Sequence, residues 1–424
     1  MIKLLHFSDA HIDIASQGKR DPQTGLPIRV LDFLKALDTI IDTAINEKIE
    51  LVIFSGDAYK DRTPVPTFQR EWGKRIMRLS QAEIPTILLV GNHDISPAAG
   101  RATALQEFST LSVPYVHLVT KPDFISSQQL NNLPIQIIAI PWITRSGFLS
   151  AHQDDLLKID EIDTNIESIT SQIIDHLMEN LDPTLPTILT AHASIHGAVY
   201  GAERSIMLGH DIVLPISLVK RKEFDYVALG HIHKAQDLNE NDHPHVIYSG
   251  SIERVDFGEA KDDKFFVIAE VDKGKSQISW RLLDGRPFID IPLDLREIYS
   301  SENQTIPTPI EIKNHLESTL IDSSEVENAI VRLTLVYPKD WDNLIDDHWF
   351  QEHFSSALDF HLVRKPIFST RLRLGDDGSI SNLPHEKLLE LYWESQKVAP
   401  EEIDTLQLIA KEIIYNQNDP EIIN

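Results

Sequence analysis

Five short clusters of Asp, Asn and His residues stand between Asp9 and His233, and each follows a short apolar run. Their side chains offer carboxylate oxygens, one amide oxygen and imidazole nitrogens, and the chain of 424 residues contains no cysteine. Such a donor set suits Mn, Fe or Zn, whereas thiolates would favour Zn or an iron–sulfur cluster. The clusters are Asp9-Ala10-His11, Gly56-Asp57, Gly91-Asn92-His93-Asp94, His192 and Gly230-His231-Ile232-His233.

The apolar run before each cluster is typical of a buried strand. Short runs of aliphatic and β-branched residues bounded by Gly, Asp or Asn indicate strands that are covered on both faces. In layered α/β folds, the loops after such strands meet at one edge of the sheet. We therefore expect the five clusters to converge on one site. The runs span residues 4–7, 51–54, 87–90, 188–190 and 226–229.

The donor set predicts a two-metal site that acts on phosphoesters. Two metal ions about 3.5–4 Å apart can share a carboxylate and clamp the attacking and leaving oxygens of a phosphoryl transfer. Asp57 is the expected bridge, and His93 is left to donate a hydrogen bond or a proton to a phosphate oxygen or the leaving group. The remaining ligands would be Asp9, His11 and His233 for the first metal, and Asn92, His192 and His231 for the second.

Taken one at a time, these motifs are weak indications. An Asp-x-His or His-x-His pair is more often a surface turn or a packed core pair than a ligand set, and Gly-Asp is a common turn dipeptide. Five clusters in order, each after its own apolar run, favour a shared site over five separate turns.

The series of motifs resembles that of the calcineurin-like metallophosphoesterase superfamily, and the sequence around the motifs is similar to the SbcD family of bacterial nuclease subunits. That family is the counterpart of the double-strand-break repair nuclease of archaea and eukaryotes. The resemblance covers about the first 285 residues and continues only loosely beyond them. It implies a Mn-dependent DNA exonuclease and endonuclease of DNA repair and recombination. The similar segments are residues 51–66, 200–214, 224–233 and 248–258.

By this resemblance, the family's metal ligands fall on the ligand positions named above, and its transition-state histidine falls on His93. One position departs from the family pattern. Many members have a second, non-ligand histidine three residues after the bridging Asp, where this chain has Lys60. An ammonium group could contact a DNA phosphate, but it cannot exchange a proton near neutral pH as an imidazole does. The balance of exonuclease and endonuclease activity is therefore open.

The formal net charge of −26 argues against a protein that binds DNA unaided, because neutralising phosphates supplies much of the affinity for DNA. Metal ions, local basic clusters and a partner would offset this charge. The clusters Arg70, Lys74, Arg75, Arg78 and Lys220-Arg221-Lys222 are more simply solvated surfaces. The candidates for DNA contact are Lys60, Arg364, Lys365, Arg371 and Arg373; for the four arginines and lysines after residue 360, a structural role remains equally open.

An α/β fold is predicted, with a layered metallophosphoesterase β-sandwich flanked by helices over residues 1–285. The pattern changes after Asp284-Gly285-Arg286-Pro287, where a small α+β capping domain (286–378) should begin, followed by a helical partner-binding segment (379–424). Residues 197–214 indicate a loop beside the site. Helical spacing occurs at residues 31–46, 66–79, 166–177, 307–320 and 346–358, and strands are expected at 329–337 and within 361–374.

Two amphipathic helices are expected to begin at Pro384 and Pro400. The second carries an apolar stripe that either packs on the capping domain or binds another protein. By resemblance that partner is an SbcC-type ATPase, and any use of ATP belongs to it, because this chain has no Gly-rich loop with Lys-Ser or Lys-Thr. The resemblance also implies a homodimer through helices near residues 66–79. The stripe consists of Ile403, Leu406, Leu408, Ile409, Ile413 and Ile414.

Three functions are consistent with the sequence. The leading one is the two-metal DNA nuclease. The second keeps the site but acts on small or cyclic phosphodiesters or on phosphoproteins, because the metals contact only the phosphate group of a substrate. The additional domain and the terminal helices argue against it, since an enzyme for small substrates would not need them. The third is a binding scaffold that has lost catalysis, although no expected catalytic residue is missing. The chain has no apolar run of the roughly 20 residues that span a bilayer and begins directly with a strand, so we expect a cytoplasmic protein without membrane contact.

Overall fold

The computed structural model describes residues 1–12, 19–95, 101–143, 159–201, 212–298, 307–368, 385–395, 398 and 400–416. The chain divides into two compact units. One consists of Met1–Leu293, Ser318–Thr334 and Asp346–Val363, and the other of Asp294–Glu317, Leu335–Ile345 and Arg364–Asn424. The boundaries near residues 285 and 378 stay predictions.

The first unit contains a mixed six-stranded sheet with the strand order β14-β13-β1-β2-β3-β4. Strands β1 to β4 run parallel, β13 pairs antiparallel with β1, and β14 pairs antiparallel with β13. Three predicted apolar runs therefore lie side by side in one sheet. The strands are β1 Ile2–Phe7, β2 Leu51–Phe54, β3 Thr86–Leu89, β4 Val116–Val119, β13 Lys264–Asp272 and β14 Lys275–Leu283.

A second six-stranded sheet has the order β11-β12-β10-β7-β6-β5. Its strands β6, β7, β10 and β12 are parallel, and the short strands β5 and β11 are antiparallel at the edges. The other two predicted runs lie here. The strands are β5 Asp123–Ile125, β6 Gln136–Ile140, β7 Thr187–His192, β10 Tyr226–Gly230, β11 Gln236–Asp237 and β12 His245–Tyr248.

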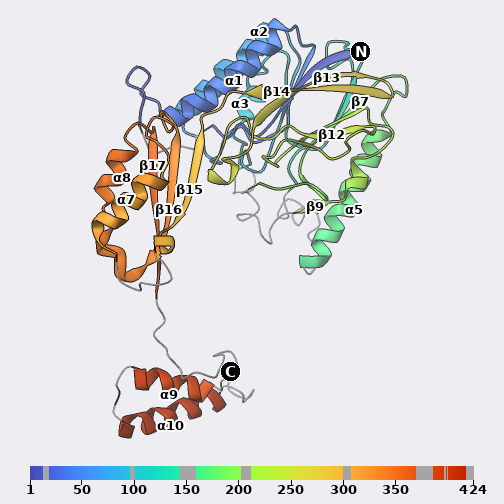
Figure 1. Ribbon diagram of the computed structural model, residues 1–424. Helices are drawn as coiled ribbons and strands as arrows, with labels where there is room; N and C mark the ends of the chain where they lie inside the picture. The colour runs from blue at the N-terminus through green and yellow to red at the C-terminus, as the bar shows by residue number, and fades with distance from the viewer. Residues whose placement is uncertain are drawn as a thin grey trace. The chain divides into compact units, whose positions relative to one another are not determined.

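The two sheets pack face to face between outer helices (Figure 1). Alternation along β1 shows how the layers arise, because Leu4 packs in the core between the sheets while Leu5 and Phe7 pack against α1 (Ile28–Asn46) and α2 (Pro66–Gln81). On the other side, α5 (Ile159–Met178) packs on the second sheet. Burying each such side chain contributes roughly 1.5–3 kcal/mol. This layering confirms the predicted α/β fold.

The helices α1 and α2 occupy the two predicted amphipathic segments. The first begins at Ile28, three residues earlier than residue 31, directly after Pro27. The second begins with Pro66, whose fixed φ suits the first helical position. Side chains of α2 that form the first basic cluster bind acidic neighbours: Arg75 lies 2.6 Å from Asp38, and Lys74 lies 2.9 Å from Glu71. These pairs favour a solvated, structural surface there.

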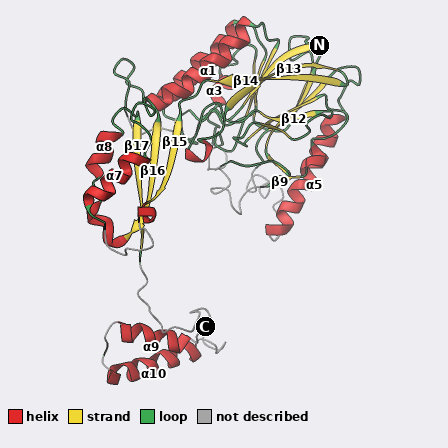
Figure 2. Ribbon diagram, viewed as in Figure 1, coloured by secondary structure: helices red, strands yellow, loops and turns green. Residues whose placement is uncertain are grey.

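Beyond residue 286, a three-stranded sheet has the order β15-β16-β17 (Figure 2). The predicted helix at residues 346–358 is too long, because α8 ends at His353 and turns lead into β17. The predicted strand within 361–374 is β17, which ends at Ile367. Arg371 and Arg373 lie outside the described residues. The elements are β15 Phe288–Asp294, α7 Pro309–Thr319, β16 Ile330–Pro338, α8 Asp347–His353 and β17 Asp359–Ile367.

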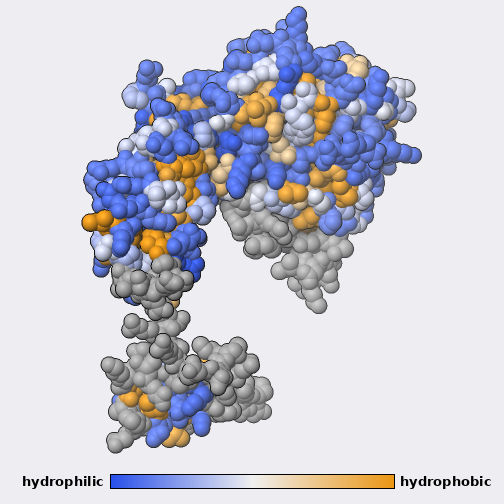
Figure 3. Space-filling view, in the orientation of Figure 1, coloured by the Kyte–Doolittle hydropathy of each residue, from blue (hydrophilic) through white to orange (hydrophobic). Residues whose placement is uncertain are grey.

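Both predicted C-terminal helices are present as α9 (His385–Ser395) and α10 (Pro400–Asn416), which lie against each other. Ile403 is buried, while Leu408 is 70% and Ile409 48% exposed. On the coloured part of this helix pair, apolar and polar residues lie next to each other (Figure 3). The remaining short elements are α3 Gln106–Thr110, β8 Ser194–Ile195, β9 Val213–Leu214, and 3-10 turns at Ile216–Leu218, Phe257–Glu259, Leu295–Ile298 and Lys339–Leu344.

Candidate metal centre

The carboxyl ends of five strands bring all eight predicted site residues together. Strands β1, β2 and β3 run parallel in one sheet, and β7 and β10 run parallel in the other, so the residues at their ends share one edge of the sandwich. His192 is the last residue of β7, whereas the other seven lie in loops after the strands. The residues are Asp9, His11, Asp57, Asn92, His93, His192, His231 and His233.

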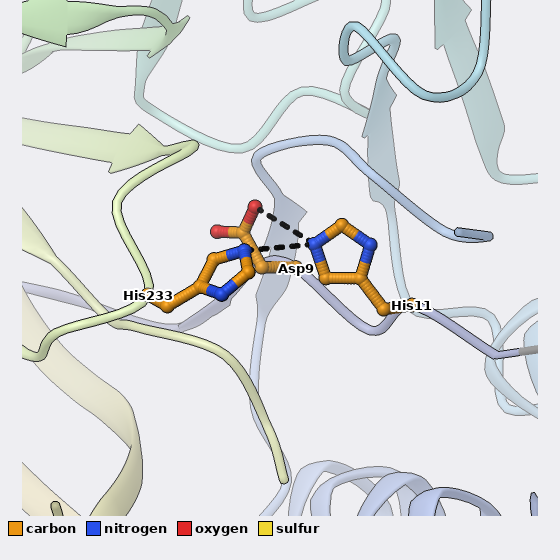
Figure 4. A group of neighbouring side chains, drawn as sticks. All are labelled: Asp9, His11 and His233. Carbon is orange, nitrogen blue, oxygen red and sulfur yellow. Dashed lines mark hydrogen bonds and ion pairs between the residues drawn. The ribbon is translucent and has the colours of Figure 1, made fainter. Parts of the chain in front are cut away.

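A first cluster consists of Asp9, His11 and His233, whose ligand atoms all lie within 4.8 Å of one another. The Nε2 atoms of His11 and His233 are 3.0 Å apart, and His11 Nε2 is 3.8 Å from Asp9 Oδ1 (Figure 4). The loop after β1 and the loop after β10 thus supply a carboxylate and two imidazoles to one point. This is the set predicted for the first metal.

The second cluster consists of Asp57, His192 and His231, also within 4.8 Å. Asn92 completes it, because its Oδ1 lies 3.0 Å from His192 Nε2 and 3.0 Å from His231 Nδ1. Asp57 Oδ2 is 3.4 Å from His192 Nε2 and 3.8 Å from His11 Nε2. One carboxylate oxygen therefore lies between the two clusters, as expected of a bridge.

His93 lies beside both Asp57 and His11. Its backbone N–H donates to Asp57 Oδ1 at 2.9 Å, and its ring centre is 5.1 Å from that of His11. Its Nδ1 lies 2.6 Å from the carbonyl oxygen of Lys60. Together with His11 and Asp57, His93 forms a third group with ligand-atom spacing. The geometry thus allows His93 to bind a metal as well as to act on the substrate, and its assignment stays a prediction.

Several site residues have a backbone conformation that side chains rarely adopt. The φ angles are 52° at Asp9, 40° at His11, 63° at Asp57 and 99° at His231. Non-glycine residues in this region cost about 1–3 kcal/mol each and tend to occur at functional sites. The loops after β1, β2 and β10 are therefore shaped to aim these side chains, and the packing of the sandwich must offset the cost.

Asp94, which was not predicted to have a role, ties the loops after β2 and β3 together. Its carboxylate is buried and accepts backbone N–H groups of Gly91 at 2.9 Å, Asp57 at 2.9 Å and Ala58 at 3.0 Å. A Cβ atom at residue 91 would collide with the Asp57 carboxylate, so only Gly fits there. The cluster Gly91-Asn92-His93-Asp94 thus supplies one ligand candidate, one catalytic candidate, a glycine that leaves room for the Asp57 carboxylate and a carboxylate that binds the Asp57 N–H.

The far nitrogens of two imidazoles are held by different partners. His192 Nδ1 lies 2.7 Å from the carbonyl oxygen of Ser55, and His233 Nδ1 lies 2.8 Å from Glu259 Oε1. When these nitrogens donate, the lone pair of each neutral ring is on Nε2, which faces the cluster. Glu259 and its partner Lys264 were missed from the sequence, because the pairing of β13 with β1 that brings Lys264 here joins distant parts of the chain.

The charges at this edge favour a cation. Burial opposes the charge on His192, but Asp57 outweighs it and raises the pKa of His192 to about 9. Burial lowers the pKa of His11 well below its ordinary value, which leaves this ring neutral with a lone pair available for a metal. Burial and the neighbouring Asp57 raise the pKa of Asp94 to about 7. Converging carboxylate, amide and imidazole lone pairs repel one another unless a cation lies between them, so the residues fit divalent metals.

An aromatic and apolar wall adjoins the second cluster. The ring centre of Trp142 lies 4.7 Å from that of His231 and 5.9 Å from that of His192. A small apolar pocket opens beside His192, lined by residues that include Ile140, Trp142 and Leu214. This wall was not predicted, because Trp142 lies outside the metal-ligand motifs. His192 and His231 are both buried next to it.

The structure describes three of the five candidates for DNA contact, Lys60, Arg364 and Lys365. Lys60 and Lys365 are exposed. Arg364 donates to the backbone carbonyl of Ile345 at 3.2 Å and lies 3.4 Å from Asp342 Oδ1, which favours its structural role. Within the described residues, no helix is both long and apolar enough to cross a membrane; the cytoplasmic location stays a prediction.

Comparison with known proteins agrees with this kind of site, a metal-dependent phosphoesterase centre. The model of the calcineurin-like phosphoesterase family matches residues 2–235, which include the eight site residues, and the chain belongs to this family. Among solved structures, it is similar to a dimetal phosphatase from Danio rerio, with 10% identity, a TM-score of 0.36, and coverage of 65% of this chain and 98% of that one. It is also similar to the protein TT1561 of Thermus thermophilus, with 14% identity, a TM-score of 0.37, and coverage of 66% and 98%.

Proposed function

We propose that this phosphoesterase is a DNA nuclease of the SbcD kind, which cuts double-stranded ends as an exonuclease and single strands or hairpins as an endonuclease. The observation that carries the hydrolytic part is the position of Asp57 Oδ2 between two clusters of imidazoles. The substrate is inferred from the segments that are similar to SbcD, such as residues 200–214 and 248–258.

Each site residue has a definite task in this proposal. Asp57 contributes to both metal sites, and two divalent ions, manganese first among them, supply Lewis-acid activation of water and phosphate when bound. His93 donates its Nδ1–H to the Lys60 carbonyl, and in the imidazolium form its Nε2 carries the second proton, which it can give to a phosphate oxygen or the leaving 3′-oxygen. The other ligands are Asp9, His11 and His233 for one ion, and Asn92, His192 and His231 for the other.

The partners are proposed on the same basis. An SbcC-type ATPase would bind the C-terminal helices, and the exposure of Leu408 and Ile409 on α10 supports this. A homodimer that presents two active sites to one DNA would form through helices near residues 66–79. Weak binding of DNA by the isolated subunit is expected, because the net charge is −26 and Arg364 is engaged by Asp342.

A second candidate function keeps the site and changes the substrate. The acidic chain and the wall formed by Trp142 would also suit a small or cyclic phosphodiester, or a phosphoprotein, which needs no extended basic surface. A scaffold without catalysis is the third candidate. The first two differ in substrate, and the third differs from both in having no turnover.

The test is an assay of the purified full chain with Mn²⁺ on linear double-stranded DNA, single-stranded DNA and a chromogenic phosphodiester. The Asp57→Ala variant removes the shared carboxylate. The matched control is Asp225→Asn, because Asp225 is equally buried but precedes β10, at the opposite end of this strand from His231. DNA cleavage that disappears only in Asp57→Ala supports the nuclease.

Other outcomes separate the candidates. Activity confined to the small ester would favour the second function and contradict the DNA substrate. If no substrate is cut, the assay is repeated with an SbcC-type ATPase and ATP; inactivity there as well would leave the scaffold.

A further inference from the structure

A buried pair of opposite charges lies directly behind His233, on the side away from the first cluster. Glu259 Oε1 is 2.8 Å from His233 Nδ1, and Glu259 Oε2 is 2.5 Å from Lys264 Nζ. The two side chains are only 2% and 1% exposed. Burying a carboxylate and an ammonium is costly even when they are paired, so stability alone is a weak reason for the pair.

Local and distant contacts both bring the pair to this place. Glu259 ends a short 3-10 turn that Asp256 caps by accepting the N–H of Gly258 at 2.7 Å. Lys264 is the first residue of β13, which runs antiparallel to β1. The start of β13 therefore lies at the sheet edge where β1 ends and Asp9 follows. Only five positions separate Glu259 from Lys264, so both belong to one short connection.

The three hydrogens of the Lys264 ammonium have three acceptors. They are Glu259 Oε2, Ser251 Oγ at 2.8 Å and the backbone carbonyl of His233 at 3.3 Å. Ser251 in turn donates its hydroxyl to Glu259 Oε2 at 3.1 Å and its N–H to the His233 carbonyl at 3.1 Å. Lys264 thus holds both the carboxylate that binds the imidazole and the backbone that carries it, and a lysine can donate no further bond.

This arrangement determines which nitrogen of His233 faces the first cluster. An ionised Glu259 accepts the Nδ1–H, so the lone pair of the neutral ring is on Nε2, 3.0 Å from His11 Nε2. An imidazole that binds a metal must present such a lone pair in a fixed direction, and a carboxylate on its other nitrogen both fixes the ring and makes it a stronger donor.

We propose that Glu259 and Lys264 are positioning residues for the first metal: Glu259 fixes the tautomer and ring direction of His233, and Lys264 holds Glu259 and the His233 backbone in place. The proposal rests on the ligand role of His233 in the proposed function. It does not depend on DNA being the substrate, since any phosphoester enzyme with this site would need the same support.

The test measures Mn²⁺ binding to the full chain by calorimetry, together with the melting temperature of the metal-free protein. Glu259→Gln should weaken one of the two Mn²⁺ sites by about 10–100-fold and leave the other within about threefold. Lys264→Met should act on the same site in the same direction. In ¹⁵N spectra of the metal-free protein, the Nδ1–H form of His233, assigned by its loss in His233→Asn, should give way to mixed tautomers in Glu259→Gln.

The matched control is Asp225→Asn. Asp225 is also a buried carboxylate paired with a lysine, Lys273 at 3.2 Å, and it also accepts backbone N–H groups, from Thr187 at 2.7 Å and Gly274 at 2.6 Å. These contacts involve no candidate ligand, and Asp225 precedes β10, whereas His231 follows this strand. Asp225→Asn should lower the melting temperature without changing either Mn²⁺ affinity.

Each further outcome has a definite meaning. If Glu259→Gln lowers the melting temperature as Asp225→Asn does and leaves both Mn²⁺ sites unchanged, the pair is only structural and the inference is wrong. If His233→Asn also leaves both sites unchanged, the ligand role of His233 fails instead. Should a single variant not fold, Glu259→Gln combined with Lys264→Met removes both charges and leaves neither uncompensated; this double variant must still weaken one site.

Discussion

The two clusters of the centre are supported in different ways. In the first, the far nitrogen of His233 is held by the side chain of Glu259, which Lys264 holds in turn. In the second, the far nitrogen of His192 is held by the backbone carbonyl of Ser55, and the ring lies so close to Gly56 that a Cβ atom there would collide with it. One support is a chain of side chains, and the other is the main chain directly after β2.

This difference means that the two metal sites depend on different parts of the sequence. A carbonyl cannot be removed by substitution, so the second cluster persists as long as β2 and β7 keep their places in the two packed sheets. A carboxylate can be removed by one substitution, so the first cluster can be weakened while the sandwich stays intact. Asp57 joins the two clusters, and variants can therefore be chosen that affect both, neither or one of them.

The largest effect is expected where both clusters are affected at once. Asp57→Asn removes the negative charge that His11 and His192 share and should reduce bound Mn²⁺ from two ions to one or fewer, because Asp57 Oδ2 faces both rings. Turnover of a phosphodiester should fall at least about 10³-fold. Metal analysis after dialysis and steady-state kinetics measure the two quantities. Two tightly bound ions in this variant would contradict the bridging role.

His93 separates catalysis from metal binding. His93→Leu should lower kcat by about 10²–10⁴-fold, because it removes a proton donor to the phosphate, while both Mn²⁺ affinities stay within about threefold. The same calorimetric titration and kinetics provide the measurement. Loss of one metal together with activity would instead assign His93 to the ligand set, which its spacing with His11 and Asp57 permits.

The ligand candidates could be found from the sequence because each follows its own strand. The runs before Asp9, Asp57 and Asn92 are apolar at nearly every position, and their ends are marked by Gly, Ser or Asp. Parallel strands then bring the ends to one edge without further information. The error at residues 354–358 also comes from a local pattern. Phe354 and Leu358 continue the helical spacing of apolar residues, but the helix ends at His353 and the chain turns into β17.

The supporting residues could not be found in this way. Lys264 at the start of a strand looks like an ordinary exposed lysine, and its burial depends on the antiparallel pairing of β13 with β1, which places Val267 opposite His6. Asp94 stands within a recognised motif, yet its three N–H donors come from the loops after two strands. Local patterns therefore predict the groups that do chemistry, and distant pairing determines what holds them.

The two clusters should also differ in how metal binding depends on pH. Asp57 raises the pKa of His192 to about 9 against the effect of burial, whereas burial lowers the pKa of His11. Near pH 7.5, Mn²⁺ should therefore displace about one proton from the second cluster and none from His11. Calorimetry in buffers of different ionisation enthalpy counts these protons, and equal release at both sites would contradict the assignment.

The same pKa gives a prediction for the stability of the metal-free protein. His192 binds its proton more tightly when folded than at its ordinary value of 6.5, so its contribution is complete below about pH 6.5 and is lost as the pH rises through about 9. The loss should be roughly 3 kcal/mol. Urea unfolding of the metal-free protein between pH 6 and 10 measures it, and His192→Asn should remove this dependence.

The smallest effect is expected at Lys60, where the family pattern has a histidine. Its backbone carbonyl, not its side chain, holds His93 Nδ1, so Lys60→Ala should leave both clusters and the turnover of a small diester within about threefold. On DNA, loss of one phosphate contact should reduce the slope of log affinity against log salt by about one. If turnover of the small diester fell more than tenfold, the Lys60 side chain would have to act on the reacting phosphate itself. The exchange of histidine for lysine at this position would then affect the rate of phosphodiester cleavage as well as the affinity for DNA.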